Sequence, residues 1–171
     1  MRWFIILLGS LVLTFVSWSA FALYSSKNDH LFFIERSKNK KIVQYDVRLT
    51  ENDNILDSDP FSVYWVLENG AQRDLTLIQR RFAYGIDSYE KLEKNKFRIS
   101  FVALKDREVI VEKVEGIFRA IIAINGKPSV LERVYVQSRE RRMGLPQVVY
   151  VDLFGRNKET GSPVKERMLP K

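Results

Sequence analysis

The chain has no cysteine and a single histidine among its 171 residues. Without cysteine it has no disulfide bond, thiol nucleophile, thiolate zinc site or iron–sulfur cluster. His30 alone makes no multi-histidine metal site, and no serine lies in the Gly-x-Ser-x-Gly elbow of a Ser–His hydrolase. The sequence therefore predicts no metal site and no cofactor. Burial of apolar side chains has to hold the fold together.

Charge is missing from residues 3–24. Arg2 supplies the positive start of a secretory signal, 4–16 its apolar middle, and Ala20-Phe21-Ala22 the small-x-small pattern that a signal peptidase requires. We therefore expect residues 1–22 to be a signal peptide, with an uncleaved membrane anchor as the alternative. In both cases the rest of the chain is expected outside the cytoplasm, periplasmic, secreted or anchored by this segment.

The remainder predicts one β-rich domain over residues 23–155, followed by a polar, loosely ordered tail over 156–171. The formal net charge of +7 suits anionic partners of the cell envelope, namely lipids, glycans or an envelope protein. Nucleic acid is not expected, because the basic residues alternate with acidic ones. Solubility alone would also explain the charge.

Strand patterns recur along the chain, with apolar residues at every second position. Val43, Tyr45, Val47 and Leu49 are one example, in which the intervening residues belong to the opposite face of a sheet. Counting every segment with this alternation predicts about eight strands in total. They are expected at residues 31–36, 42–49, 61–67, 97–103, 108–113, 117–124, 130–138 and 147–154.

Short turns separate several of these strands, which favours antiparallel neighbours. Asn125-Gly126 is the strongest signal, because both residues tolerate the positive φ of a tight hairpin. Lys105-Asp106-Arg107 and Asn69-Gly70 indicate two further turns.

One helix is expected between residues 74 and 89, where Leu75, Ile78 and Phe82 fall at helical spacing and Asp74 can cap the start. The fold class predicted is all-β and mainly antiparallel. It is either a lipocalin-like barrel or a sandwich, with the short helix plugging one end.

Three segments resemble an uncharacterised exported bacterial family, a domain of unknown function. They are Ile34-Glu35-Arg36-Ser37-Lys38-Asn39, the strand Val63-Tyr64-Trp65, and the helix end Arg81-Phe82-Ala83-Tyr84-Gly85. The resemblance extends over nearly the whole chain after the signal. It implies no activity, because none is assigned to the family.

Candidate binding residues come from these segments and from an arginine cluster after the 130–138 strand. Arginine suits a phosphate or carboxylate, since its planar fork donates two parallel hydrogen bonds. Trp65 is expected in the core with Tyr64 on the opposite face. The candidates are Arg36, Tyr64, Arg81, Tyr84, Arg139, Arg141 and Arg142.

Three functional hypotheses follow. The first is a non-catalytic module that binds a lipid, glycan or other anionic envelope ligand, with an internal cavity larger than about 300 Å³. The second is a structural or protein-interaction domain of the envelope, with a filled core and a flat exposed patch. The third and least favoured is a glycan hydrolase using a carboxylate pair drawn from Glu132, Glu140 and Asp152.

Overall fold

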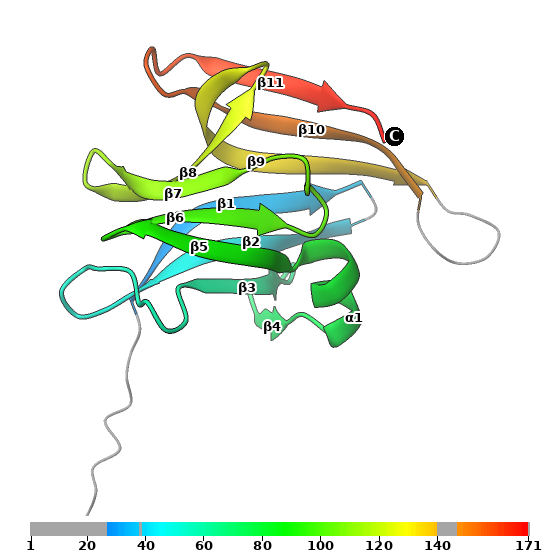
Figure 1. Ribbon diagram of the computed structural model, residues 1–171. Coiled ribbons are helices and arrows are strands. Elements are labelled where there is room, and N and C mark those ends of the chain that lie inside the picture. Colours follow the sequence, from blue (N-terminus) through cyan, green and yellow to red (C-terminus); the bar gives the residue numbers. More distant parts are fainter. Residues whose placement is uncertain (1–26, 38, 140–146, 171) are drawn as a thin grey trace, which may run out of the picture.

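The computed structural model describes residues 27–37, 39–139 and 147–170, and the expected signal segment 1–22 lies outside them. The described chain forms an eleven-stranded sheet with one short helical segment (Figure 1). That segment is α1 (Leu77–Gln79), continued by the π-helical turn η1 (Arg80–Tyr84). The strands are β1 (Lys27–Arg36), β2 (Asn39–Leu49), β3 (Phe61–Val66), β4 (Gln72–Asp74), β5 (Ile86–Glu93), β6 (Lys96–Phe101), β7 (Val109–Val114), β8 (Ile117–Ile124), β9 (Lys127–Arg139), β10 (Gln147–Asn157) and β11 (Pro163–Met168).

Strand β9 joins the two halves of the sheet. Its first residues pair with β8, and Arg133 to Val136 pair with β1 in parallel. Because β10 pairs along nearly all of one edge of β9, β8 and β1 must share the opposite edge. The sheet therefore forks into a β1–β4 half and a β5–β8 half, which curl toward each other (Figure 1).

Aromatic rings from the two halves meet in the interior. Phe101 of β6 contacts the edges of Phe32 and Tyr45, at centroid distances of 5.6 and 5.4 Å. Phe97 meets Phe61 in the same way at 5.7 Å. The inward residues of β2, expected from their alternation, are all buried, and Val43 and Val47 are 0% exposed. The core is thus a packed layer of side chains between two curled halves.

The predicted fold class is confirmed: the chain is all-β and mainly antiparallel, with one short helical segment. The curled sheet is a half-barrel that stays open between β3 and β5, which are not hydrogen-bonded to each other. All eight expected strands are present. The Asn125-Gly126 hairpin is also confirmed, with φ of 50° and 75°.

Strands β4, β5 and β11 were not predicted. β5 lacks apolar alternation and is exposed along most of its length, as is the three-residue β4. The loosely ordered tail expected over 156–171 is corrected for the described residues, because β10 continues to Asn157 and β11 pairs with it from Pro163 to Met168. Val164 and Met168 of β11 pack against the core, and its charged residues make the polar contacts described below.

The expected helix begins later in the chain, and most of its apolar side chains are exposed. Thr76, not Asp74, caps it, in a reciprocal capping box with Gln79. Of the three residues at helical spacing only Leu75 is buried, while Ile78 and Phe82 are 72% and 71% exposed. The helix lies at one end of the half-barrel, but its apolar side chains point outward.

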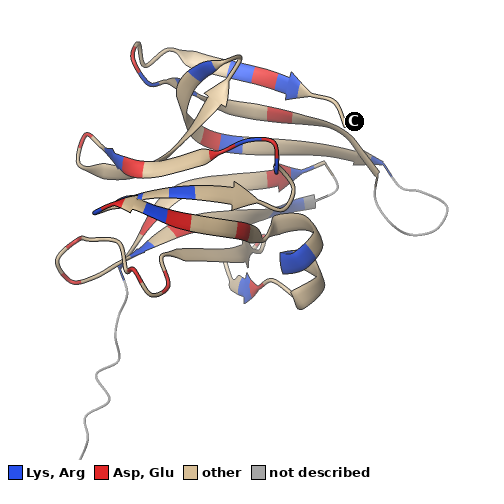
Figure 2. Cartoon of the chain, in the orientation of Figure 1, with Lys and Arg blue, Asp and Glu red and all other residues tan. Residues whose placement is uncertain are grey.

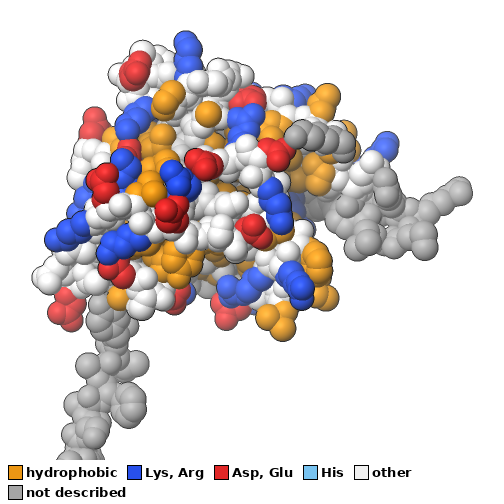
Figure 3. Space-filling view, in the orientation of Figure 1, with side chains coloured by type: hydrophobic (Ala, Val, Ile, Leu, Met, Phe, Trp, Pro, Cys, Tyr) orange, Lys and Arg blue, Asp and Glu red, His pale blue; other side chains and the backbone are white. Residues whose placement is uncertain are grey.

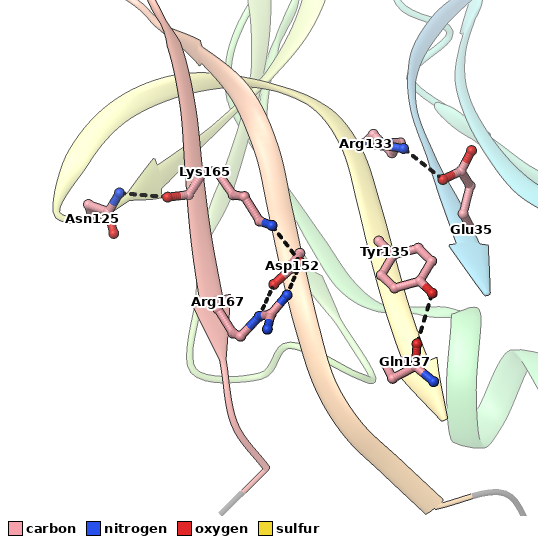
Figure 4. A network of polar contacts seen from close by, with 8 residues as sticks. All are labelled: Glu35, Asn125, Arg133, Tyr135, Gln137, Asp152, Lys165 and Arg167. Atoms are coloured by element: carbon pink, nitrogen blue, oxygen red, sulfur yellow. Dashed lines mark hydrogen bonds and ion pairs between the residues drawn. The ribbon is translucent and has the colours of Figure 1, made fainter. Parts of the chain in front are cut away.

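Two ion-pair groups fasten β11 to the rest of the sheet. Glu166 accepts hydrogen bonds from Arg107 and from the backbone N–H of Asn125. On the outer face Asp152 of β10 accepts two hydrogen bonds from Arg167, at 2.7 and 2.8 Å, and one ion pair from Lys165 at 2.9 Å (Figure 4). The bonds to Arg167 and Lys165 outweigh the effect of burial and lower the pKa of Asp152 to about 2.

Gly155 lies at an irregularity in the β9–β10 register, where β10 passes against the backbone of Val130. A Cβ at this position would overlap the Val130 carbonyl oxygen. We therefore expect Gly155→Ala to lower the free energy of unfolding by about 1–3 kcal/mol, measured by urea denaturation. Glu159→Ala is the control, because Glu159 is exposed in the nearby β10–β11 turn, whereas Ala at Gly161 would be strained by its φ of 68°. A loss no larger than that of the control would contradict the steric argument.

We call the group of Asp152, Arg167 and Lys165 the Asp152 clamp. The lowered pKa of Asp152 predicts that the stability of the fold depends on pH. Because the folded-state pKa lies below that of the unfolded chain, the clamp stabilises the fold above about pH 4 and is lost as the pH falls toward 2. In this range the unfolding equilibrium of the parent protein should shift by up to about tenfold per pH unit for this one proton. Asp152→Asn should have a lower free energy of unfolding at neutral pH, and this free energy should change less between pH 4 and 2 than in the parent. Glu159→Gln should follow the parent at each pH. Urea denaturation measures the free energy. Parallel curves for the parent and Asp152→Asn would argue against the clamp.

Candidate functional site

Arg36 is the last residue of β1, and its side chain points into the end of the half-barrel. Strand alternation places it on the side of Phe32 and Ile34, which are buried. Its neighbour Glu35 points to the outer face, where it accepts a hydrogen bond from Arg133 at 2.9 Å (Figure 4). A guanidinium group is thereby directed toward an otherwise apolar core.

Two aromatic rings hold the Arg36 guanidinium, and we call this group the Arg36 cage (Arg36, Trp65 and Tyr84). The guanidinium carbon lies 4.7 Å from the Trp65 ring centroid and 5.9 Å from that of Tyr84. Its Nη1 donates to the Tyr84 hydroxyl at 3.2 Å, whereas its Nε–H is buried without a hydrogen-bond partner. Cation–π contacts therefore stabilise the charge, but one donor remains unsatisfied.

The rings themselves are fixed by hydrogen bonds to the helical segment. The hydroxyl of Tyr45 donates to the backbone carbonyl of Tyr84 at 2.6 Å, and burial raises the pKa of Tyr45, which keeps this donor protonated. The Trp65 indole N–H donates to Gln79 at 3.1 Å, and the two cage rings meet edge to face at 5.3 Å. The helical segment thus positions both rings.

No carboxylate neutralises Arg36 within the described chain. On the outer face, by contrast, Arg133 is paired with Glu35, and Arg167 and Lys165 are paired with Asp152 (Figure 4). A partly buried guanidinium without an acidic partner attracts an anion, because its planar fork matches a carboxylate or phosphate group.

Other basic residues lie at the same end of the sheet. Val136 pairs with Arg36, and β9 ends three residues later at Arg139, which donates to Gln147 at 3.0 Å. Arg81 is exposed on the helical segment, where Figure 2 shows basic residues. Arg141 and Arg142 lie outside the described residues. The positive field at this end favours anionic ligands.

The seven candidate residues do not form one cluster. Arg36 and Tyr84 are in direct contact, and Trp65 joins them from the core as a residue that sequence reasoning had assigned to packing alone. Arg81 points outward over the ring of Phe82, at 5.8 Å. Tyr64 lies on the opposite face of β3, as its alternation with Trp65 requires.

Tyr64 belongs to a separate buried polar network around Asp46. It donates to Asp46 at 2.5 Å, and Gln44 donates to the same carboxylate at 3.0 Å. His30 Nδ1 lies 3.2 Å from the Asp46 carboxylate, and the His30 side chain is 45% exposed.

Burial alone would raise the pKa of Asp46, but the bonds from His30, Tyr64 and Gln44 lower it. Burial and the Asp46 bond raise the pKa of Tyr64. Each polar group is satisfied, so the network stabilises the β1–β3 face.

A cleft of about 530 Å³ follows the open seam between β3 and β5. Phe61, Val63 and Tyr89 line it together with ion-paired residues such as Arg48 with Asp59 and Arg80 with Asp74. The Arg36 cage is not part of its lining, although Gly85, next to Tyr84, is. The cleft is thus a lateral opening beside the filled core, different from the internal cavity that the first hypothesis predicted.

The acidic residues named for a hydrolase are engaged elsewhere. Arg167 and Lys165 of the Asp152 clamp keep Asp152 ionised, and Glu132 pairs with Arg156 at 2.9 Å. Glu140 lies outside the described residues. Within the described residues no three His, Asp or Glu side chains could hold a metal ion, and no helix is long and apolar enough to span a bilayer.

Sequence reasoning missed the residues that support the cage. Tyr45 reads as one more inward residue of β2, and nothing in the sequence pairs it with the carbonyl of Tyr84. The Thr76-x-x-Gln79 pattern of a capping box is the signal that would have found the helix start and with it Gln79, the acceptor for Trp65.

Comparison with known proteins gives one match. Residues 32–167 match the family described as Domain of unknown function (DUF4833), which covers the three segments on which the resemblance was based. No curated protein and no solved structure matches the chain. The expected membership of an uncharacterised domain family is confirmed, since the match spans more than half of the chain. The chain belongs to the DUF4833 family.

Proposed function

We propose that this chain is an exported, non-catalytic binding domain that holds the carboxylate or phosphate group of an anionic envelope ligand, a lipid or a glycan, at Arg36. The observation that carries the proposal is the Arg36 guanidinium. It is partly buried, stacked on Trp65, bonded to Tyr84 and unpaired with any carboxylate of the described chain.

The cage is organised before a ligand arrives. Trp65 and Tyr84 are fixed by Gln79 and Tyr45, so the guanidinium loses little freedom when it binds an anion. The half-buried ring of Tyr84 next to the charge suits contact with a sugar ring or an apolar headgroup, whereas Trp65 is buried behind Arg36. Arg139 and Arg81 at the same end add long-range attraction.

Binding at Arg36 should change the fluorescence of Trp65. The chain has three tryptophans, so the variant Trp3→Phe/Trp18→Phe leaves Trp65 as the sole reporter. Titration with inorganic phosphate or glucuronate should give a saturable change in emission. Arg36→Gln in this background should weaken binding at least about tenfold, which is 1.4 kcal/mol. Arg36→Lys should also weaken it, because it keeps the charge but lacks the planar fork.

Arg133→Gln is the matched control, since it removes an arginine of the outer face that Glu35 already neutralises. Its binding should equal that of the parent. Circular dichroism separates loss of binding from loss of fold. Unchanged saturable binding in a folded Arg36→Gln variant, or no response of the parent to either anion, would refute the proposal.

The open seam favours a second candidate, a protein-interaction domain of the envelope. The hydrogen bond from Arg48 N–H to the Pro60 carbonyl sets the β2–β3 register, so Phe61 and Val63 turn their backbone groups away from β2 toward the cleft. β4 covers β3 only from Tyr64 onward, and β5 pairs only with β6. Such edges accept an added strand from a partner.

A bound strand would protect the outward amides of β3. In hydrogen exchange, Phe61 and Val63 should then exchange more slowly in the native envelope fraction than in the purified protein. The amides of Ser62 and Tyr64, which face β2, serve as the internal reference. Equal exchange at Phe61 and Val63 in both samples would count against this second function.

A further inference from the structure

The helical segment carries an apolar tip, formed by Leu77, Ile78 and Phe82. Their side chains are 85%, 72% and 71% exposed. Figure 3 shows hydrophobic side chains with basic neighbours at the position that α1 has in Figure 1. Large apolar side chains exposed together on one element indicate a contact surface, since isolated ones are scattered over ordinary surfaces.

The tip is rigidly held, so its exposure is a property of the fold. The capping box of Thr76 and Gln79 fixes the first turn, and Gln79 is tied to the buried Trp65. The turn closes on Gly85, where any Cβ would overlap the backbone oxygen of Arg80. The apolar side chains are therefore presented outward by a structure that is anchored from below.

Basic residues surround the tip. Arg81 lies over the Phe82 ring, its guanidinium carbon 5.8 Å from the centroid, and Arg73 is exposed on β4. Arg80 lies 3.7 Å from Asp74. Asp87 lines the same cleft as Arg80 and Asp74, but it is paired with Lys105. The three arginines therefore leave the tip positively charged, and long basic side chains can reach a polar headgroup layer while apolar neighbours go deeper.

A lipid surface fits this tip better than a protein does. A stable protein–protein interface buries about 800 Å² on each partner, which is far more than three side chains provide. Insertion into the headgroup boundary needs only a small apolar surface combined with attraction to anionic lipids. Apolar side chains with a positive rim have this combination.

We propose that Leu77, Ile78 and Phe82 insert into the surface of a membrane that contains anionic lipids, guided by Arg73, Arg80 and Arg81. This docking is independent of ligand binding at Arg36. It brings the Arg36 cage close to the headgroups, because Tyr84 belongs to the same helical segment.

The absence of cysteine makes the test specific, since a single introduced cysteine is the sole labelling site in the full chain. The probe is an NBD fluorophore on Ile78→Cys. The matched control carries it on Glu159→Cys, an exposed position in the β10–β11 turn at the far end of the molecule (Figure 1). Vesicles are phosphatidylcholine alone or phosphatidylcholine mixed with phosphatidylglycerol.

The label on Ile78→Cys should shift to the blue and brighten on the mixed vesicles, and spin-labelled lipid should quench it. The label on Glu159→Cys should change little, which separates tip insertion from any anchoring by the N-terminal segment. Adding Leu77→Ser and Phe82→Ser should abolish the shift at Ile78→Cys, and high salt or Arg80→Gln/Arg81→Gln should reduce it.

No shift at Ile78→Cys on the mixed vesicles would overturn the proposal. So would an equal shift that survives Leu77→Ser/Phe82→Ser, or a shift that needs a protein partner and not lipid. The Arg36→Gln variant should insert like the parent. Failure of anion binding at Arg36 and failure of docking are therefore distinguishable.

Discussion

The backbone pairing of β9 is the constraint on which the rest of the structure depends. This strand has 13 residues and a length of about 43 Å at 3.3 Å per residue. It is long enough to hold β8 along one part of an edge and β1 along the next, while β10 occupies the other edge. Two strands cannot leave the same edge in one plane, so the sheet forks and each half turns its apolar face to the other.

The fork explains why a charged site forms beside a packed core. Phe32, Tyr45 and Phe101 fill the space where the halves are closest, and the cleft lies along the seam where they do not pair. At the end of the half-barrel the helical segment covers the opening and carries Tyr84 onto Trp65. Arg36 lies between these parts. Its stem continues the apolar face of β1, and its guanidinium occupies the boundary between the core and the covering segment.

Much of the fold could be predicted from the sequence, because strands with one buried face show it by alternation. Every strand with a clear apolar alternation was found, and Trp65 was correctly assigned to the core. β5 and β11 escaped because their order depends on pairing and on ions, as in the contact of Glu166 with Arg107. The spacing of Leu75, Ile78 and Phe82 predicted the helix but not its exposure, because no local pattern tells a buried stripe from an exposed one. Arg36 and Tyr84 were identified singly, but their contact joins residues 48 positions apart.

The parallel pairing of β1 with β9 has a consequence for how the chain acquires its fold. Ile34 is the partner of Val134, so the edge of β1 that β2 does not cover stays unpaired until a strand about a hundred residues later has been synthesised. Closing such a long loop is entropically costly and slows folding, because the contact becomes available only when nearly all of the chain is present. The two halves of the sheet can therefore come together only after β9 has been synthesised.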